Sequence, residues 1–244
     1  MNILTRNIWL LMILALTVVG CDQVNKILSS EPDDPNLKKI YYDNGVLKAE
    51  IRIDGNKNRH GITRQYYASG KLKSEFDYEH GTKLKAVQYY ENGNMQMEFY
   101  YREGLKHGPR GKFWEDGTLS SELQYENDNP GALVEYNKSG KQITKYPSLI
   151  VQQVDYLESR GEYWIEAYFS SNPGRGTYYR GELENGFLPN SAVEIARVYK
   201  KGRIVFKPRP GTFMMNQITI VGKYKTAYGN PYLVQKTINV AFDY

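Results

Sequence analysis

The chain has 244 residues, of which 41% are hydrophobic and 24% are charged, and it contains one cysteine. These proportions indicate a globular protein of one or two domains and exclude a long disordered chain. The formal net charge of +5 comes without a cluster of basic residues, so no nucleic-acid partner is expected. One cysteine cannot form an intramolecular disulfide or a cysteine-based zinc site. The 22 tyrosines favour a β-rich fold.

Residues 1–20 have the pattern of a signal peptide. Met1–Asn7 is a short polar start, and Ile8–Val19 is a run of 12 residues with one polar member. At about 1.5 Å per helical residue, this run is too short to cross a hydrocarbon core of about 30 Å. It is typical of the hydrophobic region of a secretion signal.

The run ends in Val18, Val19, Gly20 and Cys21, which resembles the bacterial lipoprotein signal. The resemblance implies cleavage between Gly20 and Cys21 and attachment of acyl chains to Cys21. Each buried CH₂ group contributes about 0.8 kcal/mol, so two or three chains anchor a protein stably. We therefore expect a membrane-anchored lipoprotein of the cell envelope, on the periplasmic face or the cell surface. The alternative is an ordinary signal peptide with a chance cysteine.

A polar segment with two prolines, residues 21–36, follows the cysteine and is expected to be a flexible tether. Residues 37–146 then contain five copies of one pattern, in which an aromatic pair precedes a glycine turn and an alternating run. The glycines recur every 23 to 25 residues at Gly45, Gly70, Gly93, Gly117 and Gly140. Each follows Asn, Ser or Asp, a pair that favours a hairpin turn with positive φ. The repeats predict stacked hairpins in an elongated antiparallel sheet.

The pattern of two aromatics, Asx-Gly or Ser-Gly, Leu-Lys-x-Glu and a later His-Gly resembles the MORN-variant repeat of bacterial proteins. Many of these proteins are labelled YwqK-like antitoxin components, so the resemblance implies immunity against a toxin as the role. It covers residues 40–146. The fifth copy departs from the pattern, because Asn137 replaces the second aromatic and Lys145 replaces the glutamate. Such a departure is expected of a terminal repeat.

Beyond Pro147 the period disappears, and residues 147–244 are expected to form a second domain. Trp164 is expected to be its central core aromatic. Seven strand-like segments predict an immunoglobulin-like β-sandwich, with an unrelated sandwich or part of a larger barrel as the alternative. The segments are Leu149–Asp155, Tyr163–Ser170, Thr177–Glu184, Ala192–Lys200, Arg203–Lys207, Gln217–Thr226 and Val234–Tyr244.

The sequence predicts no catalytic residue, cofactor or metal site. His60 and His107 share a repeat position and are expected about 18 to 20 Å apart, too far to share an ion; His80 is expected in a turn. A repeated set of glutamates occupies similar environments, whereas an acid and base pair needs different ones. We expect cross-strand pairing with Lys48, Lys73 or arginines instead. The set is Glu50, Glu75, Glu98 and Glu122. An envelope hydrolase would need a cleft shared by both domains.

The two aromatics of each pair point to opposite faces of the sheet. We expect one to pack in the repeat and the other to form a candidate binding face, made of Tyr42, Tyr67, Tyr90 and Trp114. The hypothesis is a non-catalytic lipoprotein that binds a protein partner through this face. The alternatives are a scaffold lipoprotein that binds glycan or another envelope component, and aromatics that only stabilise the sheet. Binding of the repeats to anionic membranes is not expected, because residues 37–146 contain 18 basic and 15 acidic residues, so their charges nearly balance.

Overall fold

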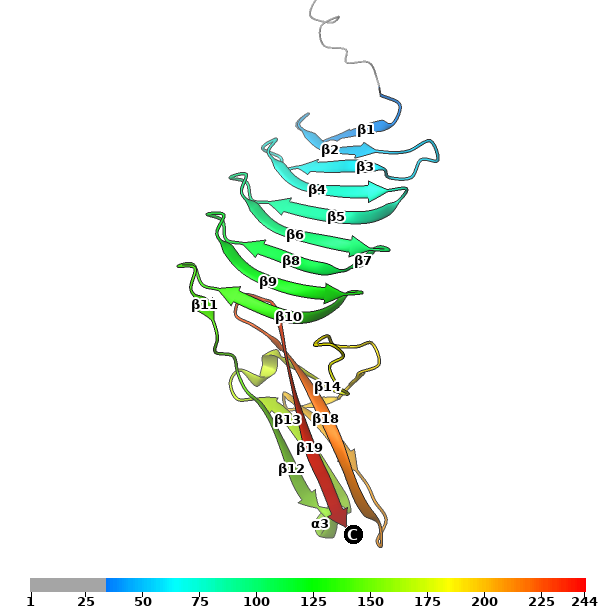
Figure 1. Cartoon of the computed structure of the whole chain (residues 1–244), viewed down its shortest axis with the longest axis vertical. Helices are drawn as coiled ribbons and strands as arrows, with labels where there is room; N and C mark the ends of the chain where they lie inside the picture. Colours follow the sequence, from blue (N-terminus) through cyan, green and yellow to red (C-terminus); the bar gives the residue numbers. More distant parts are fainter. Residues whose placement is uncertain (1–33) are drawn as a thin grey trace, which may run out of the picture.

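A computed structural model describes residues 34–244, and its regular secondary structure consists almost entirely of antiparallel strands. The predictions for the signal peptide, for cleavage at Gly20 and for lipidation of Cys21 concern residues outside this range. Within residues 34–244, no helix has the length and apolar character needed to cross a membrane. Figure 1 shows a long sheet of stacked hairpins followed along the same axis by a narrower second unit. The predicted all-β architecture is confirmed.

The first unit is one 11-stranded sheet in which neighbouring strands follow chain order, apart from β7, which pairs only with β6. Each strand pairs antiparallel with the next, as stacked hairpins require. The strands are β1 (Leu37–Tyr41), β2 (Leu47–Arg52), β3 (Gly61–Tyr66), β4 (Leu72–Glu79), β5 (Thr82–Tyr89), β6 (Met95–Arg102), β7 (Leu105–Lys106), β8 (Gly108–Phe113), β9 (Leu119–Glu126), β10 (Asn129–Tyr136) and β11 (Gln142–Ile143).

The glycine turns join consecutive strands at one side of the sheet, where the strand ends meet. The five repeat glycines have φ values from 77° to 93°. In every turn the glycine N–H donates to the carbonyl three residues earlier, with an N to O distance of 2.9 Å. The opposite side has two-residue turns with positive φ at both positions, at His80-Gly81, Glu103-Gly104 and Asn127-Asp128. Such turns match the twist of the strands they join.

One face of the long sheet carries its core. Ala49, Ser74 and Ser121 are buried there, and the register of the strands places them in one row across the sheet. Gln65, Gln88, Met97 and Lys112 lie between them in the same row, and aromatic rings occupy neighbouring positions on this face. Those rings include Phe76, Tyr78, Phe99, Tyr101 and Tyr125, with lysines over several of them. One face of the sheet therefore carries aromatic rings that pack against one another.

The second unit is a sandwich of two four-stranded sheets. Its core contains Ile165, Phe169, Tyr178, Ile220 and Val240, which are almost fully buried. One sheet has the order β12 (Leu149–Tyr156), β13 (Glu162–Phe169), β17 (Lys201–Phe206) and β16 (Arg197–Val198). The other has β15 (Val193–Glu194), β14 (Gly176–Arg180), β18 (Phe213–Lys225) and β19 (Pro231–Asp243). A short helix, α3 (Leu157–Arg160), and a 3₁₀ turn, η1 (Pro173–Arg175), complete it.

Several details of this unit differ from the prediction. The strand expected at residues 192–200 is wrong, because β15 and β16 belong to different sheets and the chain crosses between them at buried Ile195. Strand β14 ends at Arg180, four residues before the predicted end. Strand β18 begins at Phe213 and β19 at Pro231, both earlier than predicted.

The prediction that Trp164 fills the core is also wrong. Along β13 the buried apolar side chains are Tyr163, Ile165, Ala167 and Phe169, so the even-numbered Trp164 points to the outer face. Its indole N–H donates to a carboxylate oxygen of Glu162 at 2.8 Å. The guanidinium of Arg203 lies 3.9 Å from the centre of the ring.

Candidate functional site

The second aromatic of each of the first three repeats joins its repeat to the next. Its hydroxyl donates to the backbone carbonyl of the first aromatic in the following repeat, at 2.7 to 2.9 Å. The bonds run from Tyr42 to Tyr66, from Tyr67 to Tyr89 and from Tyr90 to Phe113. We call these hydroxyl contacts the tyrosine ladder. Three of the four residues expected at the binding face are thus half-buried and bonded to a neighbouring repeat.

The first aromatics of the second and third repeats form hydrogen bonds in the opposite direction along the chain, to the preceding repeat. The hydroxyl of Tyr66 donates to Glu50 at 2.8 Å, and that of Tyr89 donates to Glu75 at 2.9 Å. Burial, followed by the hydrogen bond to the carboxylate, raises the pKa of each tyrosine to about 12. The fourth repeat has Phe113 at this position, which has no hydroxyl to donate. The hydroxyl contacts therefore decrease in number toward the end of the repeat array.

Two of the four repeated glutamates form ion pairs across strands, one with an arginine, as expected, and one with a lysine other than Lys48 or Lys73. Glu75 contacts Arg64 at 2.9 Å, and Glu98 contacts Lys85 at 3.2 Å. Lys48 and Lys73 instead lie over the rings of the second aromatics of their own hairpins, with nitrogen to centroid distances of 5.3 and 5.5 Å. Their alkyl chains and charges cover the tyrosine rings that the ladder holds in place.

Trp114 stands where a fourth ladder hydroxyl would be. Its indole N–H is buried and has no hydrogen-bond acceptor among the described residues. Its ring meets Tyr228 edge to face at 5.1 Å, and Lys138 approaches it to 5.9 Å. Trp114 and Tyr90 also line a groove of about 370 Å³ together with Glu115, Asp116 and Lys138. Two of the four predicted binding-face residues therefore meet in one hollow beside the glycine turns.

The family described as MORN repeat variant matches residues 37–53, 59–80, 84–103 and 106–127. Residues 37–127 carry MORN repeat variants. The four matched segments contain the first four of the five repeats. The fifth, with Asn137 and Lys145 at altered positions, lies outside them. A search of curated proteins finds no match.

Within the MORN repeat variants, the structure brings together two histidines that the sequence did not pair. The rings of His60 and His80 lie 4.6 Å apart, and Nδ1 of His80 lies 2.8 Å from a carboxylate oxygen of Asp54. The hydrogen bond from His80 lowers the pKa of Asp54. Both histidines are exposed, and His80 forms the two-residue turn between β4 and β5. Residues 34–244 contain no group of three or more His, Cys, Asp or Glu side chains placed to hold a metal.

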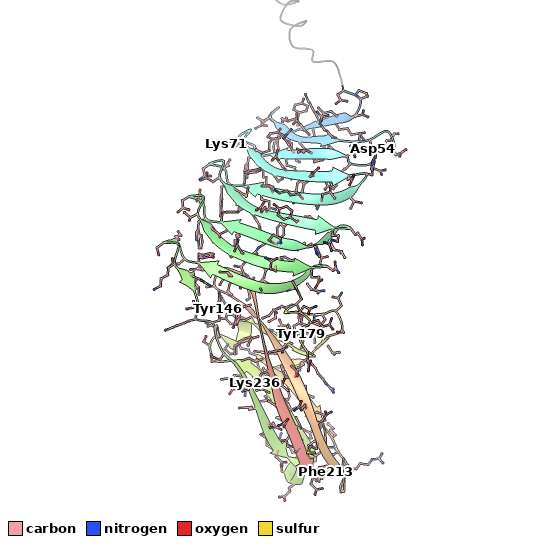
Figure 2. All side chains as sticks on the ribbon, in the orientation of Figure 1. Asp54, Lys71, Tyr146, Tyr179, Phe213 and Lys236 are labelled. Carbon is pink, nitrogen blue, oxygen red and sulfur yellow. The ribbon has the colours of Figure 1, made fainter. Side chains whose placement is uncertain are left out.

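The end of the long sheet at β10, beyond the matched MORN segments, is covered by the tip of the β18 and β19 hairpin. Glu135 of β10 is 1% exposed and accepts hydrogen bonds from Thr226 and Asn230 at 2.7 and 2.5 Å. Lys112 donates to the carbonyl of Tyr228 at 2.9 Å. A parallel stack of Tyr146 on Tyr232, 4.2 Å between centroids, adjoins this contact and Figure 2 labels Tyr146 there. We call these contacts the joint.

Sequence reasoning missed the joint. It assigned the role of terminal cap to the degenerate fifth repeat, whereas the hairpin tip also covers that end of the sheet. The available signal was Glu135, a carboxylate two residues from Leu133 on the inward side of β10, where no earlier repeat has an acidic side chain; the equivalent residues are Ile40, Gln65, Gln88 and Lys112. A carboxylate on the buried face of a strand requires partners from elsewhere in the chain.

Proposed function

We propose that this protein is a non-catalytic lipoprotein of the cell envelope that binds a protein partner through its MORN repeat sheet. The signal pattern ending at Cys21 supports membrane anchoring through acyl chains. The MORN repeat resemblance supports toxin immunity as the biological role, in which the partner is a toxin delivered to the envelope.

The observation that carries the proposal is the groove at Trp114. It combines two aromatic rings with two carboxylates and one lysine, at the one ladder position where the aromatic forms no hydrogen bond to the next repeat. Aromatic rings with polar neighbours are the side chains that most often dominate the energy of a protein interface. The groove also lies on the side that presents the glycine turns, which are accessible to a partner.

The test is capture of a partner by the full chain purified from detergent-solubilised membranes. We expect Trp114→Ala and Lys138→Ala each to reduce the captured amount at least fivefold. Lys71→Ala is the matched control, because Lys71 is an exposed turn lysine of the second repeat and lies outside the groove. Thermal melting shows whether the Trp114 variant folds, and Lys138→Ala keeps the test valid if it does not. Capture that both variants leave unchanged would contradict the proposal.

Anchoring is tested separately with Cys21→Ala. We expect the wild-type chain to enter the detergent phase and the variant to enter the aqueous phase after phase separation, because the variant has no thiol for acylation. A Cys21→Ala variant that stays with the membrane would argue against anchoring through Cys21. The N-terminal segment would then remain uncleaved or hold the chain in another way.

A second candidate function, glycan binding by a scaffold lipoprotein, is favoured by the composition of the same groove. A flat indole ring can stack on a sugar ring while Glu115 and Asp116 accept its hydroxyl groups. Retention of purified envelope polysaccharide by the immobilised chain, lost in Trp114→Ala, would support this candidate over a toxin partner. An adjacent toxin gene would favour immunity, and a polysaccharide gene cluster would favour the scaffold.

A further inference from the structure

A cleft of about 530 Å³ lies where the MORN array meets the sandwich. Its walls come from β7, β9 and β10 of the repeat sheet and from η1, β14, β16, β18 and β19 of the sandwich. In Figure 1 the upper ends of β18 and β19 lie directly below β10, which is where the two units meet. The volume is within the range of about 300 to 1,000 Å³ that is typical of small-ligand sites, and such sites favour domain junctions.

The cleft is strongly basic. Five cationic side chains line it, and Asp128 is the one carboxylate among its lining residues. The cations are Lys106, Arg175, Arg197, Lys223 and Lys225. Their sources are the repeat sheet, both sheets of the sandwich and the 3₁₀ turn, so the fold gathers cations that are distant in sequence. No segment of the sequence contains this cluster, for the same reason.

The cations are held in place without being neutralised. The described ion pairs of residues 34–244 involve none of the five. Arg175 donates to the carbonyl of Thr226 at 3.0 Å, and Arg197 donates to that of Gly176 at 3.2 Å. A guanidinium has five N–H donors, so each arginine retains donors for a ligand.

Two of the lysines rest on aromatic rings. Lys106 lies 5.3 and 5.4 Å from the ring centres of Phe99 and Tyr125, and Lys223 lies 5.0 Å from that of Tyr179. Figure 2 labels Tyr179 at the level of the junction. A ring face orients an ammonium group but leaves its full charge available. Lys225 follows Lys223 by two residues on β18 and therefore points to the same side of the strand.

Two other hollows of the described chain have more acidic than basic side chains. The groove at Trp114 contains Glu115 and Asp116. A hollow at the far end of the sandwich is lined by Asp155, Glu158 and Asp243, without a cationic side chain. The basic lining thus distinguishes the junction cleft from these two hollows.

We propose that the junction cleft binds a phosphate-bearing ligand. Five cations against one carboxylate leave about four charges to compensate, and a diphosphate or two phosphate groups carry that charge in a small volume. Arginine forks bind phosphate oxygens in pairs, and lysines add point charges. The ligand would contact the repeat sheet and the sandwich together. This site is separate from the partner groove, so either proposal can fail without the other.

The test is isothermal titration calorimetry, in which sodium pyrophosphate is added to the full chain purified in detergent. Each titration is made at a fixed ionic strength, and the series is repeated at several concentrations of sodium chloride. We expect saturable binding that weakens as sodium chloride is raised. The double variant Lys223→Gln and Lys225→Gln should weaken binding at least tenfold. The control is Lys236→Gln. Lys236, labelled in Figure 2, is an exposed lysine of β19 outside the cleft, so this variant should bind pyrophosphate as the wild type does. Arg197→Gln gives a second variant from another strand.

Absence of pyrophosphate binding, or equal binding by the double variant and the control, would overturn the proposal. Citrate tests the chemistry, because equally tight binding of a tricarboxylate would overturn the assignment to phosphate. Vesicles of phosphatidylcholine with and without phosphatidic acid identify the source. If the vesicles that contain phosphatidic acid compete with pyrophosphate, the site is assigned to a lipid headgroup. If pyrophosphate binds and these vesicles do not compete with it, the site is assigned to a soluble or polymeric phosphate.

Discussion

At the scale of single residues, the tyrosines of the repeats act mainly as connectors. Tyr67 bonds to the following repeat through its hydroxyl and supports Lys73 on its ring. The sequence predicted the aromatic pairs, because they recur with the repeat period. The second member of each pair lies beyond the end of its strand, so strand alternation alone does not fix its direction. The sequence could not predict the acceptors of the hydroxyls, because these lie 22 to 24 residues away and depend on how the hairpins stack.

Removing one ladder hydroxyl tests this role. We expect Tyr67→Phe to lower the free energy of unfolding by about 1 kcal/mol, since the carbonyl of Tyr89 loses its donor while the ring is retained. Tyr41→Phe is the control, because Tyr41 is 55% exposed, belongs to the first repeat and has no preceding repeat to bond. Its effect should be within about 0.5 kcal/mol of zero. Urea denaturation followed by fluorescence measures both, and equal values would argue against the ladder.

The two carboxylate-bonded tyrosines predict an alkaline transition. Their pKa of about 12 lies above the usual value near 10, so the folded chain binds these protons more tightly than the unfolded chain. Their contribution to stability is complete below pH 10 and is lost as the pH rises from 10 to 12. The double variant Tyr66→Phe and Tyr89→Phe should therefore lose less stability over this window than the wild type. Denaturation curves at pH 9, 10, 11 and 12 measure the difference, and parallel losses would contradict the assignment.

At the scale of elements, the turns were predictable and the sandwich strands were less so. The repeat period and the Asx-Gly pairs mark a backbone conformation that few residues other than glycine adopt, so sequence indicates it directly. The strands β15 and β16 have two residues each, and a period-two pattern cannot separate them when Ile195 lies between. Their assignment to different sheets is decided by packing, which a local pattern does not contain.

The turn conformation gives a matched pair of glycine variants. Gly93 has φ of 93° and Gly55 lies outside the positive region, and a methyl group at either position would meet nothing within 4 Å. We expect Gly93→Ala to cost about 1 to 2 kcal/mol, because the backbone strain is its only effect. Gly55→Ala should be neutral or stabilise the chain by up to about 1 kcal/mol through the unfolded state. Chemical denaturation decides between these signs, and a neutral Gly93→Ala would show that the turn tolerates a side chain.

At the scale of the whole molecule, the joint determines how the two units are coupled. Its contacts are 91 and 95 residues apart in sequence for the pairs of Glu135 with Thr226 and Asn230. No periodicity or motif links such positions, which is why the sequence predicted two domains but no interface. The same interface creates the basic cleft, since Arg175 at its wall donates to the carbonyl of Thr226. A substitution at Glu135 is therefore expected to affect both the coupling of the two units and the geometry of the basic cleft.

Glu135→Leu should uncouple the two units. The substitution removes the shared acceptor of Thr226 and Asn230, and each buried group left without a partner costs about 1 to 3 kcal/mol. Glu122→Leu is the control, because Glu122 lies on the adjacent strand β9 and is exposed. We expect differential scanning calorimetry of the full chain to show a lower melting temperature and a broader or divided transition for Glu135→Leu alone. Pyrophosphate binding should weaken in the same variant, because the hairpin that carries Lys223 and Lys225 would no longer be fixed against the repeats. If both variants melt as the wild type does, the hairpin tip does not couple the MORN array to the sandwich.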